Sequence, residues 1–321
     1  MEANASLCEM ALPISLSAAL VLGGGCFSAT ASADVLPPQL LFATGAGGTD
    51  YDYGHGIAVD PDGNSLVTGS FFGPVTFGAG EPKEITLDQG GMFLAKYAAD
   101  GSLRWATQAS AMMGRGVAVD ADGNPLVSGL FHGTAVFGAD EPNQTTLEGG
   151  NLFLAKYAAN GRLLWAEAIQ TADTGGVYTN EGGPVAVDAA GNVLVTGWFQ
   201  GFLVFGEGEP EEALLVSAGS RDVFVAKYAP DGRLLWARKD GGAESEFGAG
   251  IAADRHGNSL VTGNFLAATT FGAGEPTETS LISADGLLDV FVAKYSPDGA
   301  LLWVTQAGAD GYDRSFGIAT D

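Results

Sequence analysis

The stretch GIAVDPDGNSLVTG at residues 56–69 recurs along the chain with few changes. The further copies are GVAVDADGNPLVSG at 116–129, PVAVDAAGNVLVTG at 184–197 and GIAADRHGNSLVTG at 250–263, and a fifth copy covers 317–321. The aspartates that follow the short apolar runs are 60, 68, 66 and 67 residues apart. A recurrence of this size is the signature of a repeat architecture, in which one supersecondary unit stacks on the next.

Each copy reads as two β-strands joined by a turn. In the first copy, residues 56–60 and 65–71 are β-type runs, and Asp-x-x-Gly-Asn separates them. Asp and Asn bond to nearby backbone groups and Gly accepts positive φ, so this segment predicts a hairpin loop. Phe-Gly and Glu-Pro pairs follow, and because proline excludes a central strand we expect an edge or an outward loop there, with a short extra strand possible near Phe77.

The second half of each unit predicts another hairpin. The run FLAKY at residues 93–97 alternates strictly, so its first, third and fifth side chains share one face. An Asp-Gly or Asn-Gly turn then leads into Leu-x-Trp, and such dipeptides are the strongest short hairpin signal. The lysine and the tryptophan recur in all four units: Lys96, Lys156, Lys227 and Lys294, and Trp105, Trp165, Trp236 and Trp303.

These signals predict an all-β fold made of four-stranded antiparallel units, and such units repeated radially form a β-propeller. The 49 Gly and 13 Pro are too many for a helical bundle, and no segment has a capped 3.6-residue period, so helices should be few. We expect the small residues of Gly-Ile-Ala-Val-Asp nearest the axis and the aromatic residues between blades. Four full units and a partial one leave two alternatives: a ring closed with four or five blades, or a piece of a longer propeller.

The runs GIAVDPDGNSLVTG and FLAKYAADGSLRW, with the Gly-rich segment that links them, resemble the bacterial β-propeller repeat called SBBP. The resemblance covers residues 40–321 and recurs four times. It implies a secreted or cell-surface propeller, often part of a larger protein, that has no settled biochemical activity. It supplies no catalytic residues to carry over. The Glu-Pro loop is longer than the barest form of the repeat.

A leader precedes the repeats. We expect residues 1–33 to be a secretion signal cleaved after Ala33 or a lipoprotein leader modified at Cys26, because a long uncharged stretch ends there in small residues. An uncleaved anchor or a wrongly assigned start of the chain is the remaining alternative. Residues 34–39 form a Pro-containing spacer, and residues 40–321 form the propeller domain. Both main alternatives predict an extracellular, periplasmic or cell-surface protein that reaches a membrane only through a lipid anchor.

The chain is strongly acidic. Its formal net charge is −24 at pH 7, and only Glu2 and Glu9 of its acidic residues lie in the leader. Such a surface repels phosphate backbones, so we expect no nucleic-acid partner. The two cysteines, Cys8 and Cys26, both precede the repeats, which therefore hold no internal disulfide.

Two of the turns carry oxygen ligands of the kind that calcium prefers: Asp60, Asp62, Asn64, Asp120, Asp122 and Asn124. They lack the bidentate glutamate of a calcium loop, so a structural turn is the main interpretation and calcium the alternative. No other cofactor is expected. We interpret the repeated lysines and tryptophans as structural, together with the repeated aspartates, which are Asp60, Asp120, Asp188 and Asp254.

The sequence predicts no catalytic residue. An insertion at residues 171–183 carries Tyr178 and Asn180, and exposed loops on one face of a repeat array often bind ligands. Our leading hypothesis is therefore an exported binding or scaffolding module for an unknown protein or glycan at the cell surface. One alternative is a carbohydrate-acting hydrolase or lyase with carboxylates such as Glu181, Glu209 and Asp240. Another is a purely structural surface-layer repeat.

Overall fold

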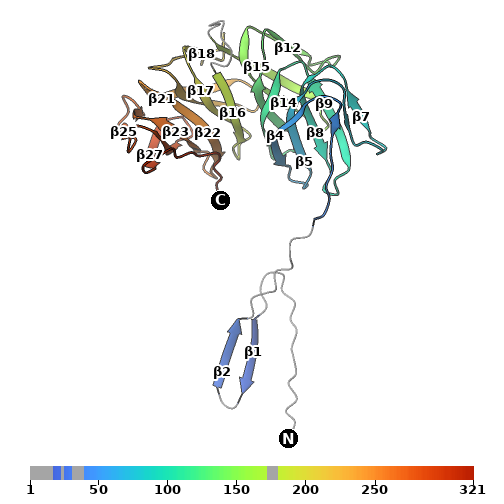
Figure 1. Ribbon diagram of the computed structural model, residues 1–321, viewed down its shortest axis with the longest axis horizontal. Helices are drawn as coiled ribbons and strands as arrows, with labels where there is room; N and C mark the ends of the chain where they lie inside the picture. The colour runs from blue at the N-terminus through green and yellow to red at the C-terminus, as the bar shows by residue number, and fades with distance from the viewer. Residues whose placement is uncertain (1–16, 23–24, 31–39, 172–179) are drawn as a thin grey trace. The chain divides into compact units, whose positions relative to one another are not determined.

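The computed structural model describes residues 17–22, 25–30, 40–171 and 180–321 (Figure 1). The chain forms two compact units, Met1–Ala43 and Thr44–Asp321. In the first unit, β1 (Ser17–Leu22) and β2 (Gly25–Thr30) pair as an antiparallel hairpin.

Cys26, the candidate lipidation site, lies in β2 opposite Val21. Ala33, the candidate cleavage site, falls outside the described residues. Within the described ranges, no helix is long and apolar enough to cross a membrane.

The second unit contains one four-stranded antiparallel blade for each repeat, which confirms the predicted all-β propeller fold. Blade 1 is β4 (Asp52–Val59), β5 (Ser65–Phe71), β8 (Gly91–Tyr97) and β9 (Leu103–Ala109). Blade 2 is β10 (Met113–Val119), β11 (Pro125–Leu130), β14 (Gly150–Tyr157) and β15 (Leu163–Thr171). Blade 3 is β16 (Asn180–Val187), β17 (Val193–Phe199), β20 (Asp222–Tyr228) and β21 (Leu234–Gly242). Blade 4 is β22 (Glu246–Ala253), β23 (Ser259–Leu266), β26 (Leu288–Tyr295) and β27 (Leu301–Ala307).

A complete hairpin separates the second and third strands of every blade, where the sequence predicts only one short extra strand. The prediction fell short because the Glu-Pro pair lies in the loop between two strands and interrupts neither. The hairpins are β6 (Val75–Phe77) with β7 (Ile85–Leu87), β12 (Thr134–Phe137) with β13 (Thr145–Glu148), β18 (Phe202–Phe205) with β19 (Ala213–Val216), and β24 (Ala268–Phe271) with β25 (Thr279–Ile282).

These hairpins connect neighbouring repeats. β18 pairs with β15, the last strand of the preceding blade, and β24 pairs with β21 in the same way. β6 pairs with β3 (Gly47–Gly48), which lies at the corresponding place before blade 1. Backbone hydrogen bonds therefore join successive repeats in addition to side-chain packing.

The first strands of successive blades lie side by side and very close together. A methyl group on Gly56 would lie 3.0 Å from the carbonyl oxygen of Arg115, and one on Gly250 would lie 2.8 Å from the Cα of Gly317. Glycine at these two positions permits the close approach, because a Cβ there would crowd the neighbouring backbone. The fifth copy, residues 317–321, thus lies beside β22 as β10 lies beside β4, and Thr320 Oγ1 donates a 2.6 Å hydrogen bond to the carbonyl of Ala253.

The four blades follow one another along an arc (Figure 1). Ile57 of β4 is 70% exposed, whereas Val117, Val185 and Ile251 at the same place in the later blades are at most 9% exposed. In the part of the chain that the structure describes, no other blade therefore covers β4, and these four blades do not close into a ring.

Apolar layers between consecutive blades form the core. Leu94 of blade 1 packs in one layer with Phe153 of blade 2, and Leu154 of blade 2 packs in the next layer with Phe224 of blade 3. The alternation of FLAKY thus presents opposite faces of one strand to the two neighbouring blades. Phe137 and Phe153 are typical of the aromatic pairs in these layers, with ring centroids 4.8 Å apart. Each such buried side chain contributes roughly 1.5–3 kcal/mol to stability.

Candidate functional site

Every blade holds an ion pair between its repeated aspartate and lysine. The Nζ–Oδ2 distances are 2.7 Å for Lys96–Asp60, 2.9 Å for Lys156–Asp120, 2.9 Å for Lys227–Asp188 and 2.8 Å for Lys294–Asp254. The first three pairs are buried, whereas the side chain of Lys294 is 23% exposed because no complete blade follows it.

The turn itself fixes each aspartate. Oδ1 of Asp60 accepts hydrogen bonds from the backbone N of Asp62, at 3.0 Å, and of Asn64, at 2.8 Å. Burial acts to raise the pKa of Asp60, but hydrogen bonds from Lys96 and Asn64 outweigh it and lower the pKa to about 2. The Asp-x-x-Gly-Asn signature therefore builds a carboxylate that stays charged beside a lysine.

This geometry bears on the calcium hypothesis. The Nδ2 atoms of Asn64 and Asn124 donate to the adjacent aspartates, and the side chains of Asp62 and Asp122 are exposed. Among the residues that the structure describes, no group of three or more His, Cys, Asp or Glu side chains could hold a metal ion. Calcium binding stays an untested alternative, and the cation that faces the carboxylate here is the lysine.

The repeated tryptophan reaches from each blade to the next. The indole Nε1 atoms of Trp105, Trp165 and Trp236 donate to backbone carbonyls in the Asp-Gly or Asn-Gly turn of the following blade. The acceptors and distances are Ala159 at 3.0 Å, Pro230 at 3.1 Å and Pro297 at 2.9 Å. Trp303 has no complete blade after it and is 42% exposed.

The Glu-Pro loop has a structural role that the sequence did not reveal. Its glutamate accepts a hydrogen bond from the backbone N of the leucine in Leu-x-Trp, so it ties the inserted hairpin to the fourth strand. The four bonds are Glu81 to Leu103 at 2.7 Å, Glu141 to Leu163 at 2.8 Å, Glu209 to Leu234 at 2.8 Å and Glu275 to Leu301 at 2.7 Å. The recurrence of glutamate 22 to 26 residues before leucine was the available signal.

The structure describes the side chains of two of the three carboxylates considered for catalysis, and one of the two belongs to the set of tying glutamates. Glu209 is one of the tying glutamates. Asp240 is 3% exposed and accepts hydrogen bonds from the backbone N of Gly272, at 2.6 Å, and from Tyr295 Oη, at 2.9 Å. The side chain of Glu181 and the residue Tyr178 fall outside the described part of the chain.

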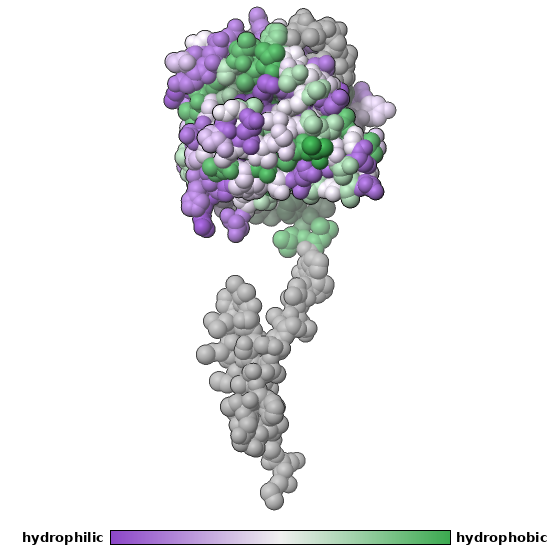
Figure 2. Space-filling view, turned by 90° about the vertical axis from the view of Figure 1, so that its left-hand side faces the viewer, coloured by the Kyte–Doolittle hydropathy of each residue, from purple (hydrophilic) through white to green (hydrophobic). Residues whose placement is uncertain are grey.

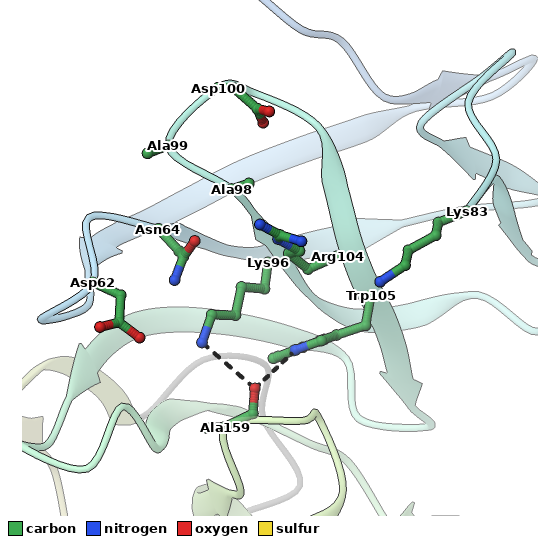
Figure 3. A pocket seen from close by; sticks show the side chains of 10 residues that line it. All are labelled: Asp62, Asn64, Lys83, Lys96, Ala98, Ala99, Asp100, Arg104, Trp105 and Ala159. Atoms are coloured by element: carbon green, nitrogen blue, oxygen red, sulfur yellow. Dashed lines mark hydrogen bonds between the residues drawn. The ribbon is translucent and has the colours of Figure 1, made fainter.

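A surface hollow of about 620 Å³ lies where blade 1 meets blade 2 (Figure 3). Turns and strand ends of blade 1 provide most of its walls, and the turn before β15 of blade 2 provides Ala159. We call it the turn hollow, and its lining residues are Asp62, Asn64, Lys83, Lys96, Ala98, Ala99, Asp100, Arg104, Trp105 and Ala159.

Two cations distinguish the turn hollow from the rest of the repeat. Lys83 in the β6–β7 loop and Arg104 in β9 are both exposed, and no ion pair joins either to a carboxylate among the described residues. Two hydrogen bonds from Ser102 are the main cause of the lowered pKa of Asp100. The positive charge of Arg104 lowers this pKa further from a longer distance. The other repeats place Asn143, Glu211 and Thr277 where Lys83 stands, and Leu164, Leu235 and Leu302 where Arg104 stands.

Elsewhere the surface is mixed. On the side shown in Figure 2, hydrophilic and hydrophobic residues alternate in small patches. Another hollow, of about 520 Å³, is lined by residues that include Arg115, Trp198 and Phe247. The guanidinium of Arg221 lies 4.5 Å from the ring centroid of Trp198, beside that hollow.

Comparisons with known proteins agree with this architecture. Residues 43–70 match the family described as SBBP, beta-propeller repeat. An uncharacterized WD repeat-containing protein of Acanthamoeba polyphaga mimivirus is 26% identical over 188 residues, which make up 53% of this chain. The match spans only 14% of that relative's length.

Two solved structures show distant similarity. A protein of unknown function from Bacteroides caccae superposes with a TM-score of 0.38 at 12% identity, over 84% of this chain and 86% of its own. A gluconolactonase from Xanthomonas campestris superposes with a TM-score of 0.30 at 16% identity, over 83% and 88% of the two chains. The match at residues 43–70 and the four described blades together show a β-propeller fold with an SBBP repeat in its first blade.

Proposed function

We propose that the protein is an exported binding module that holds its ligand in the turn hollow between blades 1 and 2. The observation that carries this proposal is the pair of exposed cations, Lys83 and Arg104, which form no ion pair with the described residues, in a chain with a net charge of −24. Solvated charges on such a surface are mostly acidic, so two exposed cations that line one hollow offer an anionic group of a ligand partners that most of the surface does not.

A comparison of the repeats distinguishes residues that the fold requires from residues that are available to bind a ligand. The ion pair, the tryptophan bond and the glutamate tie recur in successive blades, so they belong to the fold. Lys83 and Arg104 occur in one repeat alone, and the other repeats fold with neutral or acidic residues at the same places. A charge that the fold does not need is available for a ligand.

The walls of the turn hollow are held in place. Lys96 and Trp105 both donate to the carbonyl of Ala159, so the two blades that form the hollow are fixed to each other. A preformed site loses little conformational entropy on binding. Export is supported by the uncharged stretch of residues 10–33 in the leader, and it would place the hollow opposite proteins and glycans of the cell surface.

The repeats also provide the variants for the test. Lys83→Asn with Arg104→Leu installs the residues of blade 2, Asn143 and Leu164, and removes both cations. Arg162→Ser is the matched control, because it removes an exposed cation from the next blade and installs the residue that blade 1 carries there, Ser102.

The chain and both variants would be applied to an array of neutral and acidic glycans and of acidic and basic peptides. We expect wild type and Arg162→Ser to bind the same compounds and the double variant to lose them, with equal thermal unfolding midpoints for all three. Binding to no compound, or equal binding by the double variant, would contradict the proposal.

A further inference from the structure

We infer that the ligand of the turn hollow is a glycan with spaced carboxylates, such as one that contains hexuronate residues. This inference rests on the proposed binding function and names its ligand class. It follows from four features of the hollow, which concern its cations, its acids, its backbone and its indole ring.

The cations select a carboxylate. A guanidinium matches the two oxygens of a carboxylate in a bidentate arrangement, and an ammonium acts as a point charge. Arg104 lies on β9 and Lys83 on the β6–β7 loop, so the two donors reach the hollow from different elements. Figure 3 shows both side chains among the lining residues. Each of the two donors can pair with a carboxylate of the ligand.

The acids limit how much negative charge the ligand can carry. Asp62 and Asp100 line the same hollow and are exposed. Their oxygens accept hydrogen bonds from hydroxyl groups but repel a second anion close to the first. The net charge of −24 adds repulsion to any dense polyanion. A hexuronate, which has one carboxylate among several hydroxyls, fits this pattern.

The backbone disfavours a peptide ligand. Peptides often bind by adding a strand to an open sheet edge. The turns that wall the hollow use their own backbone groups: Gly63 N donates to Asp60 O, Ala98 N to Ser102 O, and Gly101 N to Ala98 O. Side chains therefore provide the recognition, as a glycan requires.

The indole ring adds an apolar surface. Trp105 is half-buried, and its N–H is already bonded to the carbonyl of Ala159. What the ring offers a ligand is therefore its carbon surface rather than a donor. A sugar ring, with C–H groups on one side and hydroxyls at its edge, suits a half-buried aromatic ring beside carboxylates.

The test is isothermal titration of the full chain with a galacturonate trisaccharide and with the same trisaccharide after its carboxyls are reduced to alcohols. We expect reduction to raise Kd by about tenfold or more, since a charge-assisted bidentate pair is lost. Arg104→Leu should weaken the acidic trisaccharide by a similar factor and leave the Kd of the reduced one unchanged. Arg162→Ser should change neither.

Equal Kd values for the acidic and the reduced trisaccharide would overturn the inference while leaving the proposed binding function intact. The same holds if an acidic peptide binds in place of both sugars and Arg104→Leu abolishes its binding. Tighter binding of heparin, a dense polyanion, than of the trisaccharide would also overturn it. A different result would contradict the proposed function itself, namely that the array shows no compound whose binding depends on Lys83 and Arg104.

Discussion

The indole Nε1 of Trp105 donates a 3.0 Å hydrogen bond to the carbonyl oxygen of Ala159, an atom of the next blade. Lys96 Nζ lies 3.5 Å from the same oxygen and 2.7 Å from Asp60 Oδ2. One carbonyl of blade 2 therefore meets the tryptophan and the ion pair of blade 1 (Figure 3). The contact that joins the blades also forms the floor of the turn hollow, so stability and binding share these residues.

Removing the indole donor between two blades should cost more than removing it at the end of the array. Trp165→Phe deletes the hydrogen bond to the carbonyl of Pro230 and should lower the free energy of unfolding by about 1–2 kcal/mol. Trp303→Phe is the matched control, because Trp303 is 42% exposed and should change stability by less than about 0.5 kcal/mol. Urea unfolding measures both, and equal losses would contradict an inter-blade role.

The turn glycine that lies under the indole should not tolerate a methyl group. A Cβ on Gly161 would lie 2.9 Å from the ring of Trp105, and its φ is +88°. Gly208 has a similar φ of +79° but nothing within 4 Å, so Gly208→Ala reports the backbone strain alone. We expect Gly161→Ala to lower the thermal unfolding midpoint by several degrees more than Gly208→Ala. Similar midpoints would show that the ring moves aside freely.

The ion pair between Lys156 and Asp120 should stabilise the fold above acidic pH. Burial acts to raise the pKa of Asp120, but hydrogen bonds from Lys156 and Asn124 outweigh it and leave the pKa below the ordinary 3.8. The folded state thus releases this proton more readily than the unfolded state, so the contribution is present above pH 3.8 and is lost as pH falls through the folded pKa.

Lys156→Met leaves Asp120 buried without its cation and should cost about 3 kcal/mol at pH 7. Adding Asp120→Asn should recover part of that loss, because the remaining partners are neutral. The free energy of unfolding, measured for the single and double variants, checks this coupling. Additive losses would show that the two side chains do not act as a pair.

Glu246 should make stability fall as the pH rises toward neutrality. Its side chain is fully buried, and burial, with a further contribution from the nearby Asp222, raises its pKa to about 7. Between the unfolded value of 4.5 and about 7, the folded state binds the proton and the unfolded state does not, so stability decreases. The loss is about 3 kcal/mol across that window and does not grow above it.

Glu246→Gln removes the titration and should flatten this part of the stability profile. Asp285→Asn is a suitable control, because Asp285 is exposed and its pKa is lowered by hydrogen bonds from the backbone N atoms of Gly311 and Leu287. Unfolding free energies at pH 5, 6, 7 and 8 compare the variants with wild type. An unchanged slope in Glu246→Gln would assign the pH dependence to another group.

Calcium should not stabilise the folded protein. Lys96 already stands 2.7 Å from the carboxylate of Asp60, so a bound cation would have to displace an intramolecular ammonium. Thermal unfolding midpoints in excess EDTA and in millimolar calcium should therefore agree. A rise of several degrees with calcium would mean that the Asp-x-Asp-Gly-Asn turns, or other acidic groups, bind the ion in the folded state.

Much of the fold could be read from the repeats. The alternation in FLAKY and the turn dipeptides fixed the strands, because strand period and turn chemistry are local properties. Glycine at the start of GIAVD predicted the crowded inner strand, and Gly56 indeed approaches the backbone of Arg115. The inserted hairpin was missed because the sequence alone does not show whether a proline interrupts a strand or lies in the loop between two strands.

The turn hollow was not predictable from the sequence alone. Lys83, Arg104 and Asp62 lie on three different elements, and nothing local connects them until the blade folds. The signal that could have found two of them is a difference between repeats, namely a cation where the other copies have neutral or acidic residues. Their proximity depends on long-range strand pairing, which spacing within a repeat does not encode.

The most direct test of binding in the turn hollow uses the five tryptophans of the chain as reporters. Protein labelled with ¹⁵N at the indole nitrogen gives one N–H signal for each tryptophan, and Trp105 is the one that lines the hollow. On titration with the galacturonate trisaccharide, we expect the Trp105 signal to shift progressively while those of Trp165, Trp236 and Trp303 stay in place. No shift of the Trp105 signal at saturating trisaccharide, or equal shifts of all the signals, would contradict binding at this site.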